Sequence, residues 1–194
     1  MKKLLTLALA CLGSVALSVP AAQGRQVPPP KDVYAAKFLC GSFLPRTPVP
    51  PSDGVPEPPV KPGNYLTVIN VHNPNGTILP FRKKAVLLYR ADKAQPGETP
   101  MPPGKILGVE LSPDFGLEID CADIRTRLLA GTAPAPTFIE GWVVIIVSGV
   151  GQAEPLPLDV TAVYTSHGWD QSGKVPIYVG FAEDVQPVLP KRVR

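Results

Sequence analysis

The run Trp142-Val143-Val144-Ile145-Ile146-Val147 places six large apolar residues in succession at the length of a single β-strand. Gly141 precedes the run and Gly149 follows it closely, so both ends carry residues that interrupt regular structure. A short, uninterrupted apolar run with such boundaries is typical of a strand that lies inside a sheet. The sequence therefore predicts a central strand over residues 142–147 that is buried on both faces.

Shorter strand patterns lie on both sides of this run and are separated by proline and glycine. Residues 65–72 alternate in polarity and stop at Asn73-Pro74-Asn75-Gly76, a sequence typical of a turn. Because strand-like residues follow this turn, residues 65–90 are predicted to form a hairpin. The predicted strands, seven or eight in all, comprise residues 32–40, 65–72, a returning strand made of 77–81 and 84–90, 106–111, 115–121, 142–147, 158–165 and 175–181.

One short helix is predicted after residue 120. Asp120 or Asp123 can cap its N-terminus, and Ile124 and Leu128 share one face at a spacing of four residues. With so little helix among many strands, the predicted fold is all-β: an antiparallel immunoglobulin-like β-sandwich, with a small barrel as the second choice.

Proline is concentrated between the predicted strands. The chain holds 26 Pro and 17 Gly in 194 residues, and many of the prolines lie in residues 43–62 and 91–105. Proline lacks a backbone N–H and fixes its own φ, so these stretches are predicted to be long Pro-rich loops on a folded domain.

The N-terminus has the pattern of an export signal. Lys2 and Lys3 precede an apolar segment, and small residues near Ala21 suit cleavage by a signal peptidase. The predicted organisation is a signal peptide at 1–22, a flexible segment at 23–31, a β-sandwich domain at 32–186 and a frayed basic tail at 187–194. Two alternatives are an uncleaved anchor helix and lipidation at Cys11.

Removal of the signal changes the charge balance of the chain. The formal net charge of +3 falls to +1 when Lys2 and Lys3 are lost. A protein that binds the phosphate backbone needs a basic face, so nucleic acid is not an expected partner. No transmembrane segment is expected in the mature chain.

Removal of the signal also leaves two cysteines, Cys40 and Cys121. An even number of cysteines in an exported chain is most simply explained by a disulfide. The alternatives are two buried free thiols or a pair of metal ligands.

Five sequence blocks stand out along the chain: YAAKFLCG (34–41), INVHNP (69–74), Phe81 with KKA (83–85), LEIDC (117–121) and LDVTAVYT (158–165). With these blocks the chain resembles a group of uncharacterised exported bacterial proteins in which similar blocks recur in the same order. The resemblance covers most of residues 33–166. It implies that Cys40 and Cys121 belong to one framework, and it implies no activity.

The chain contains two histidines, His72 and His167, both predicted to lie at strand ends. If those ends coincide, the two imidazoles and a carboxylate such as Asp170 or Asp159 could hold a metal ion. The alternative is structural: His72 bonds the neighbouring turn, and His167 is a solvated loop residue.

No catalytic pattern is evident in the sequence. There is no Gly-x-Ser-x-Gly nucleophile motif, no phosphate-binding glycine loop and no blue-copper spacing. The sequence therefore predicts a non-catalytic exported protein, periplasmic, cell-surface or extracellular, with a binding or structural role and no cofactor. Its expected partner is another envelope or surface protein or a polymer; the alternative is a metal-binding protein or metal-dependent enzyme using His72 and His167.

Overall fold

The computed structural model describes residues 28–43, 62–90, 102–130, 137–150, 153–170 and 177–193. The predicted signal peptide, most of the segment at 23–31 and most of both Pro-rich loops lie outside these residues. The strands are β1 (Lys31–Phe43), β2 (Gly63–His72), β3 (Leu79–Arg90), β4 (Leu107–Leu111), β5 (Gly116–Ile119), β6 (Phe138–Ser148), β7 (Asp159–Asp170), β8 (Ile177–Pro187) and β9 (Lys191–Val193).

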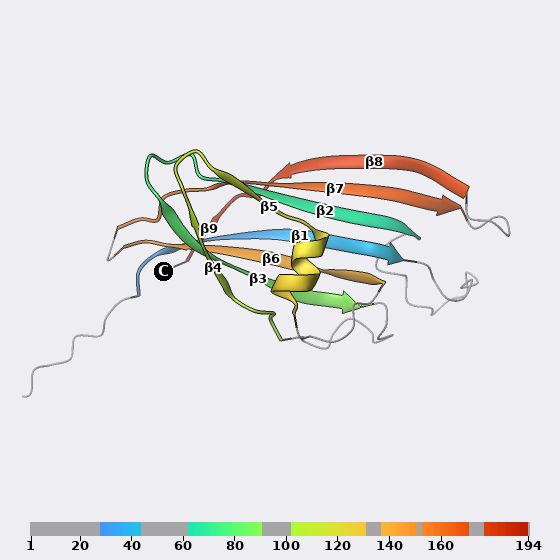
Figure 1. Ribbon diagram of the computed structural model, residues 1–194, viewed down its shortest axis with the longest axis horizontal. Helices are drawn as coiled ribbons and strands as arrows, with labels where there is room; N and C mark the ends of the chain where they lie inside the picture. Colours follow the sequence, from blue (N-terminus) through green and yellow to red (C-terminus); the bar gives the residue numbers. More distant parts are fainter. Residues whose placement is uncertain are drawn as a thin grey trace, which may run out of the picture.

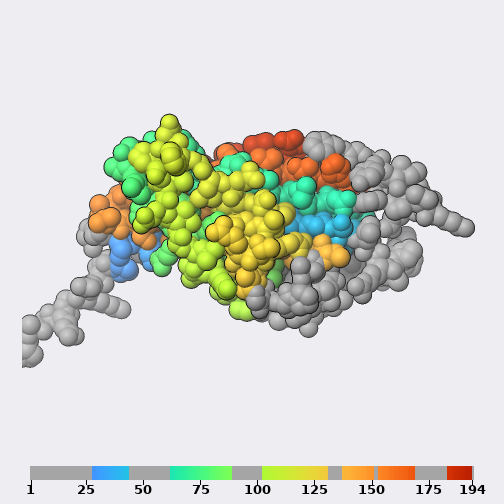
Figure 2. Space-filling model, viewed as in Figure 1, coloured from blue at the N-terminus to red at the C-terminus, as the bar shows by residue number. Residues whose placement is uncertain are grey.

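The nine strands form one antiparallel sheet, which confirms the prediction of an all-β fold. The strand order is β4-β3-β6-β1-β2-β7-β8, with β5 paired to β2 and β9 paired to β1. In Figure 1 the long strands run side by side, while β4, β5 and the helical segment cross them on the near side. Figure 2 shows residues 102–130, coloured yellow-green to yellow, covering the middle of this face.

Strand β6 contains the apolar run Trp142–Val147 and is central, between β3 and β1, as predicted. The prediction that it is buried on both faces is wrong. Val143, Ile145 and Val147 are fully buried, whereas Trp142 is 37% exposed on the opposite face and its neighbours there are partly exposed. Strand β6 is therefore buried on one face only, and the core lies on that side of the sheet.

Gly141 allows a close approach within this core. A Cβ at residue 141 would lie 2.1 Å from the Val86 carbonyl oxygen and 2.8 Å from the Phe38 ring. Any larger residue would displace either the backbone of β3 or the buried ring.

Strands β1 and β2 pair only at one end, where Gly41–Phe43 lie opposite Gly63–Tyr65. Beyond this point the strands diverge: β2 continues against β5, and β1 pairs with β9 near its other end. The Thr67 side chain connects the diverging strands through hydrogen bonds to the backbone of Leu39. Buried side chains of β1, β2, β5 and β7 belong to one hydrophobic core. They include Tyr34, Phe38, Cys40, Ile69, Val71, Ile119 and Ala162.

The predicted hairpin over residues 65–90 is wrong. Strand β2 pairs with β1, β5 and β7, whereas β3 pairs with β4 and β6. The reason lies in the turn, where the Asn73 N–H and carbonyl bond Phe115 and Asp114 instead of closing across their own loop. The chain therefore passes from one part of the sheet to another at this point.

The helical segment begins as predicted. Asp120 caps α1 (Cys121–Asp123) by accepting a 2.7 Å hydrogen bond from the Asp123 N–H. The following π-helical turn η1 (Ile124–Leu128) buries Ile124 and Leu128 completely. A buried ion pair of 2.8 Å between Lys83 and Asp123 joins the helix to β3.

The C-terminal tail was predicted to fray, but residues 191–193 form β9 against Lys31–Val33. Arg192 forms an ion pair with the buried carboxylate of Asp32, and this contact gives the short strand a specific partner. The sheet accordingly continues beyond residue 186 and includes residues 191–193. No helix among the described residues is long and apolar enough to cross a membrane.

Candidate functional site

Cys40 and Cys121 form the predicted disulfide. Cys40 is fully buried in β1, and Cys121 begins the helical segment. Arg125 donates a 2.6 Å hydrogen bond to the Cys40 carbonyl, so the same junction is held by a polar contact as well. The bond attaches the helical layer to the sheet, and it is a structural element of the core.

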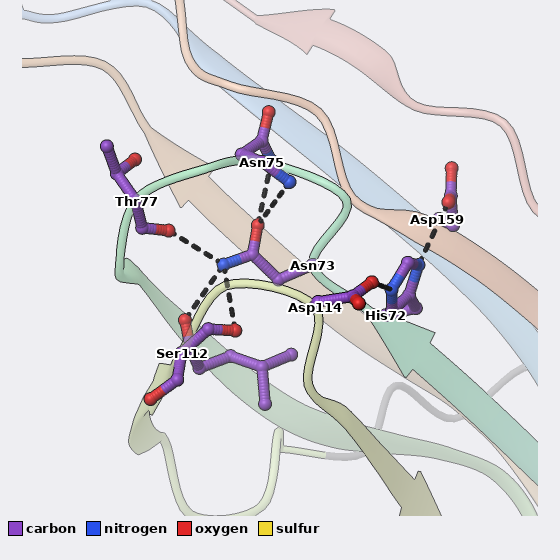
Figure 3. Close-up of polar contacts among 8 residues, drawn as sticks. His72, Asn73, Asn75, Thr77, Ser112, Asp114 and Asp159 are labelled. Carbon is purple, nitrogen blue, oxygen red and sulfur yellow. Dashed lines mark hydrogen bonds and ion pairs between the residues drawn. The ribbon is translucent and has the colours of Figure 1, made fainter.

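His72 lies at the end of β2 between two carboxylates (Figure 3). Its Nδ1 is 3.2 Å from an Asp159 oxygen, and its Nε2 is 3.2 Å from an Asp114 oxygen. Asp159 is the register partner of His72 on β7, whereas Asp114 belongs to the turn between β4 and β5. Asp114 adopts φ 61°, a left-handed conformation that aspartate tolerates better than most residues.

The two carboxylates raise the pKa of His72, with the hydrogen bond to Asp159 the larger cause and that to Asp114 the second. A neutral imidazole has one N–H and can donate to one carboxylate only, whereas the protonated ring donates to both. The arrangement therefore favours the imidazolium. Its side chain is 41% exposed and the two carboxylates are more exposed still, so the ion pairs are solvent-screened.

Asn73 organises the turn beside His72 and is fully buried. Its amide nitrogen donates to the carbonyls of Thr77, Leu111 and Ser112 at 2.9, 2.9 and 3.2 Å. Its amide oxygen accepts from the backbone N–H and the side chain of Asn75. This one side chain thus joins the β2–β3 loop to the end of β4 and fixes the turn that carries Asp114 (Figure 3).

A shallow depression of about 510 Å³ extends from His72 across β5, β2 and β7. Asn70 lies between Glu118 and Thr161 in register, and Gly116 beside His72 leaves space where a side chain would stand. These groups can form hydrogen bonds with a polar ligand. The described residues contain no group of three or more His, Cys, Asp or Glu side chains placed to hold a metal ion.

The structure separates the two histidines that were considered as joint metal ligands. His72 pairs with Asp159, whereas His167 pairs with Asn64 near the opposite end of β2. About eight residues of extended strand, or ~26 Å, separate these positions. Asp170 lies still farther along β7, opposite Ile177, so one ion cannot contact His72 together with His167 or Asp170.

The role of Asp114 could not be found from the sequence. It lies in a turn far from His72 along the chain, and only the contact of the Asn73 backbone with that turn brings the two together. Asp159 was considered as a metal ligand, but its contact is with the Nδ1 atom of His72 itself. The sequence signal for this site was therefore limited to His72 and its neighbouring turn.

Comparison with known proteins gives no family. No family model and no curated protein matches the chain. Among solved structures, the chain is similar to the crystal structure of Thermotoga maritima 1070, with a TM-score of 0.36 and 9% sequence identity. That alignment covers 83% of this chain and 93% of the other. A likeness this distant assigns neither a fold family nor a function.

Proposed function

We propose that the protein is exported and has a non-catalytic binding or structural role in the cell envelope or extracellular space. The observation that carries this proposal is the disulfide between the buried Cys40 and the partly buried Cys121. Disulfides of this structural kind persist in oxidising compartments and are rare in the reducing cytosol. The signal-like residues 1–22 and the near-neutral charge that remains without them agree with export.

The His72 site supports binding better than catalysis. Both ring nitrogens face carboxylates, and no hydroxyl or thiol is bonded to the ring among the described residues. A general base needs one nitrogen free to accept a proton from a nucleophile or water. The exposed depression beside the ring instead offers hydrogen-bonding groups to a surface polymer or another envelope protein.

We also propose that the strands of the sheet form an immunoglobulin-like sandwich of two layers. One layer would consist of β3, β6 and β1, and the other of β5, β2, β7 and β8, joined where β1 pairs with β2. A contact between Tyr34 and Leu158 supports facing layers. The Tyr34 hydroxyl, on β1, accepts a 2.8 Å hydrogen bond from the backbone N–H of Leu158, which directly precedes β7. A crystal structure in which the two sets of strands do not pack face to face would contradict this arrangement.

Expression of the complete chain with fractionation of the cells tests the export proposal. The expected product is found outside the cytoplasm, lacks about 22 residues and gains two hydrogens in mass on reduction. Lipidation at Cys11 would add the mass of acyl chains and retain the protein in the membrane fraction. A full-length, fully reduced protein in the cytoplasm would contradict the proposal.

The binding role is tested by co-sedimentation of the purified, oxidised protein with washed cell envelopes. We expect saturable sedimentation that excess unlabelled protein competes away. An equal sedimentation of an unrelated protein of similar size and charge would argue against specific binding.

A further inference from the structure

A second depression, of about 500 Å³, lies beside β1 and shares no lining residue with the depression at His72. One wall consists of Ala35, Lys37 and Trp142 from β1 and β6. The other consists of Tyr164, Asp184 and Gln186 from β7 and β8. Pro187, Val188 and Leu189 also line the depression. We propose that this depression binds a neutral saccharide, a ligand class that deepens the proposed envelope role and rests on it.

Two aromatic side chains, Trp142 and Tyr164, line the depression together with aliphatic residues. Trp142 begins an otherwise aliphatic run, and 37% of its surface is exposed although it lies on a central strand. Tyr164 lies on the opposite wall and is half-buried. Flat aromatic surfaces with a polar atom at the edge suit the C–H faces and hydroxyls of sugar rings, which are amphipathic in the same way.

The polar groups of the depression still have hydrogen-bonding capacity. The Tyr164 hydroxyl makes no hydrogen bond to another described residue. Burial raises the pKa of Tyr164, and the charge of Asp184 raises it further. The Gln186 side chain donates a 2.6 Å hydrogen bond to one oxygen of Asp184. The side-chain carbonyl of Gln186 and the second carboxylate oxygen of Asp184 can accept hydrogen bonds from a ligand. A ligand hydroxyl can supply a hydrogen bond that the described residues do not give the Tyr164 hydroxyl.

The backbone of β1 adds further donors and acceptors. The Leu39 N–H and carbonyl both bond the Thr67 side chain, so they point away from β6. By the two-residue period of a strand, the same groups of Lys37 and Ala35 point in that direction. Among the described strands, β9 pairs with Lys31–Val33 of β1, and β2 pairs with Gly41–Phe43. Between these two stretches, this edge of β1 is not paired with a described strand beside the depression.

The charges favour a neutral ligand. Lys37 is neutralised by Glu140 at 2.6 Å, and Asp184 contributes a negative charge without a cationic partner among the described residues. An anionic polymer would meet that carboxylate without a compensating cation, whereas sugar hydroxyls can both donate to it and accept from the β1 N–H groups. An extended peptide could also pair with the open edge, but it would not require the two aromatic walls.

Tryptophan fluorescence provides the test, because the chain has two tryptophans, Trp142 and Trp169. In W169F, Trp142 is the sole indole, and we expect a saturable spectral shift with at least one of three probes: the neutral hexasaccharides of glucose, N-acetylglucosamine and mannose. The expected Kd is about 1 mM or tighter. Calorimetry should show binding weakened about tenfold in W142A and severalfold in D184N and Y164F, with unchanged melting temperatures.

The matched controls are E183Q, which alters the neighbouring exposed residue on the other face of β8, and F115A, which removes an exposed aromatic ring elsewhere. Both should bind the sugar like the parent protein. The proposal is overturned if none of the probes binds at about 5 mM, if W142A binds equally well, or if polygalacturonate or a peptide binds at this site in preference to the neutral sugars. Envelope binding that persists in W142A would remove this site while leaving the proposed function in place.

Discussion

The Thr67 hydroxyl bonds both backbone groups of Leu39, accepting from its N–H at 3.0 Å and donating to its carbonyl at 3.1 Å. This side chain takes the place of a strand ladder where β1 and β2 separate. Thr67 is almost fully buried, and its own N–H faces the Cys121 sulfur at 3.3 Å. The point of divergence is thus held by one hydroxyl group and the disulfide beside it.

Replacement of Thr67 by valine should lower the free energy of unfolding by about 1–3 kcal/mol, because two backbone groups of Leu39 lose their partner. Urea denaturation followed by circular dichroism measures the change. T67S keeps the hydroxyl and should lose about 1 kcal/mol or less, for the missing methyl group. Equal losses in the two variants would show that the hydroxyl bonds contribute little.

The disulfide should make the larger contribution to stability. Cys40 and Cys121 are separated by 81 positions. By the chain-entropy relation, a cross-link that closes a loop of this size constrains the unfolded chain and stabilises the folded protein by about 4–5 kcal/mol. The double variant C40A/C121A should therefore unfold at much lower urea concentration than the oxidised protein. Reduction of the parent protein should produce a similar shift, and reductant should not affect the double variant. An unchanged midpoint in both experiments would contradict the structural role of the bond.

Most strands were predictable from the sequence because each carries its own alternation or apolar run, but β7 and β8 extend beyond the predicted ends at residues 165 and 181, and β9 was not predicted. The pairing of the strands was not predictable, and residues 65–90 show why: Asn73-Pro74-Asn75-Gly76 has the chemistry of a turn, but turn chemistry does not determine where the next strand goes. The decisive contacts are between the Asn73 side chain and the carbonyls of Leu111 and Ser112, nearly 40 residues later. A local pattern contains no information about such partners.

The same limitation applies to the candidate sites. His72 was noticeable as one of two histidines, yet its partner Asp114 is defined by the approach of a distant turn. Trp142 was assigned to a doubly buried strand because the apolar run does not reveal how the second face is covered. The disulfide was predictable because only two cysteines remained once the signal was set aside.

Replacement of Asn73 should destabilise the protein strongly. In N73D an oxygen replaces the amide nitrogen that donates to three carbonyls, and N73A leaves those carbonyls without this donor. We expect a loss of about 2–4 kcal/mol for N73D and somewhat less for N73A. The control is N70A, which changes an exposed asparagine on β2 and should remain within about 0.5 kcal/mol of the parent. A mild effect of N73D would mean that the turn is held by other contacts.

The His72 imidazolium should be favoured in the folded protein. Because the folded pKa is raised above the value of 6.5, the stabilisation from its ion pairs is fully present below pH 6.5 and is lost as the pH rises through the folded pKa. The proton NMR signal of the ring reports the midpoint, and H72Q identifies which of the two histidine signals it is. D159N should lower the midpoint more than D114N does, since Asp159 is the larger cause. A midpoint that neither variant moves would contradict the bridging geometry.

Arg192 should stabilise the domain although it belongs to a basic tail of the kind that usually frays. Its guanidinium contacts both oxygens of Asp32, whose side chain is 3% exposed, and an Nη2–Oδ2 distance of 3.0 Å marks the second contact. R192M removes the cation and leaves a buried carboxylate. Since Arg192 itself is 42% exposed, the expected loss of unfolding free energy is smaller than that for a fully buried ion pair.

Two further variants separate the ion pair from the strand that carries it. K191A alters the neighbouring residue of β9, for which no ion pair is present among the described residues, and should change stability by about 0.5 kcal/mol or less. D32N/R192M should be less destabilised than the sum of its single variants, because the second change removes the uncompensated charge. If R192M and K191A have the same unfolding midpoint in urea, β9 pairs through its backbone alone and the Asp32–Arg192 contact contributes nothing to the fold.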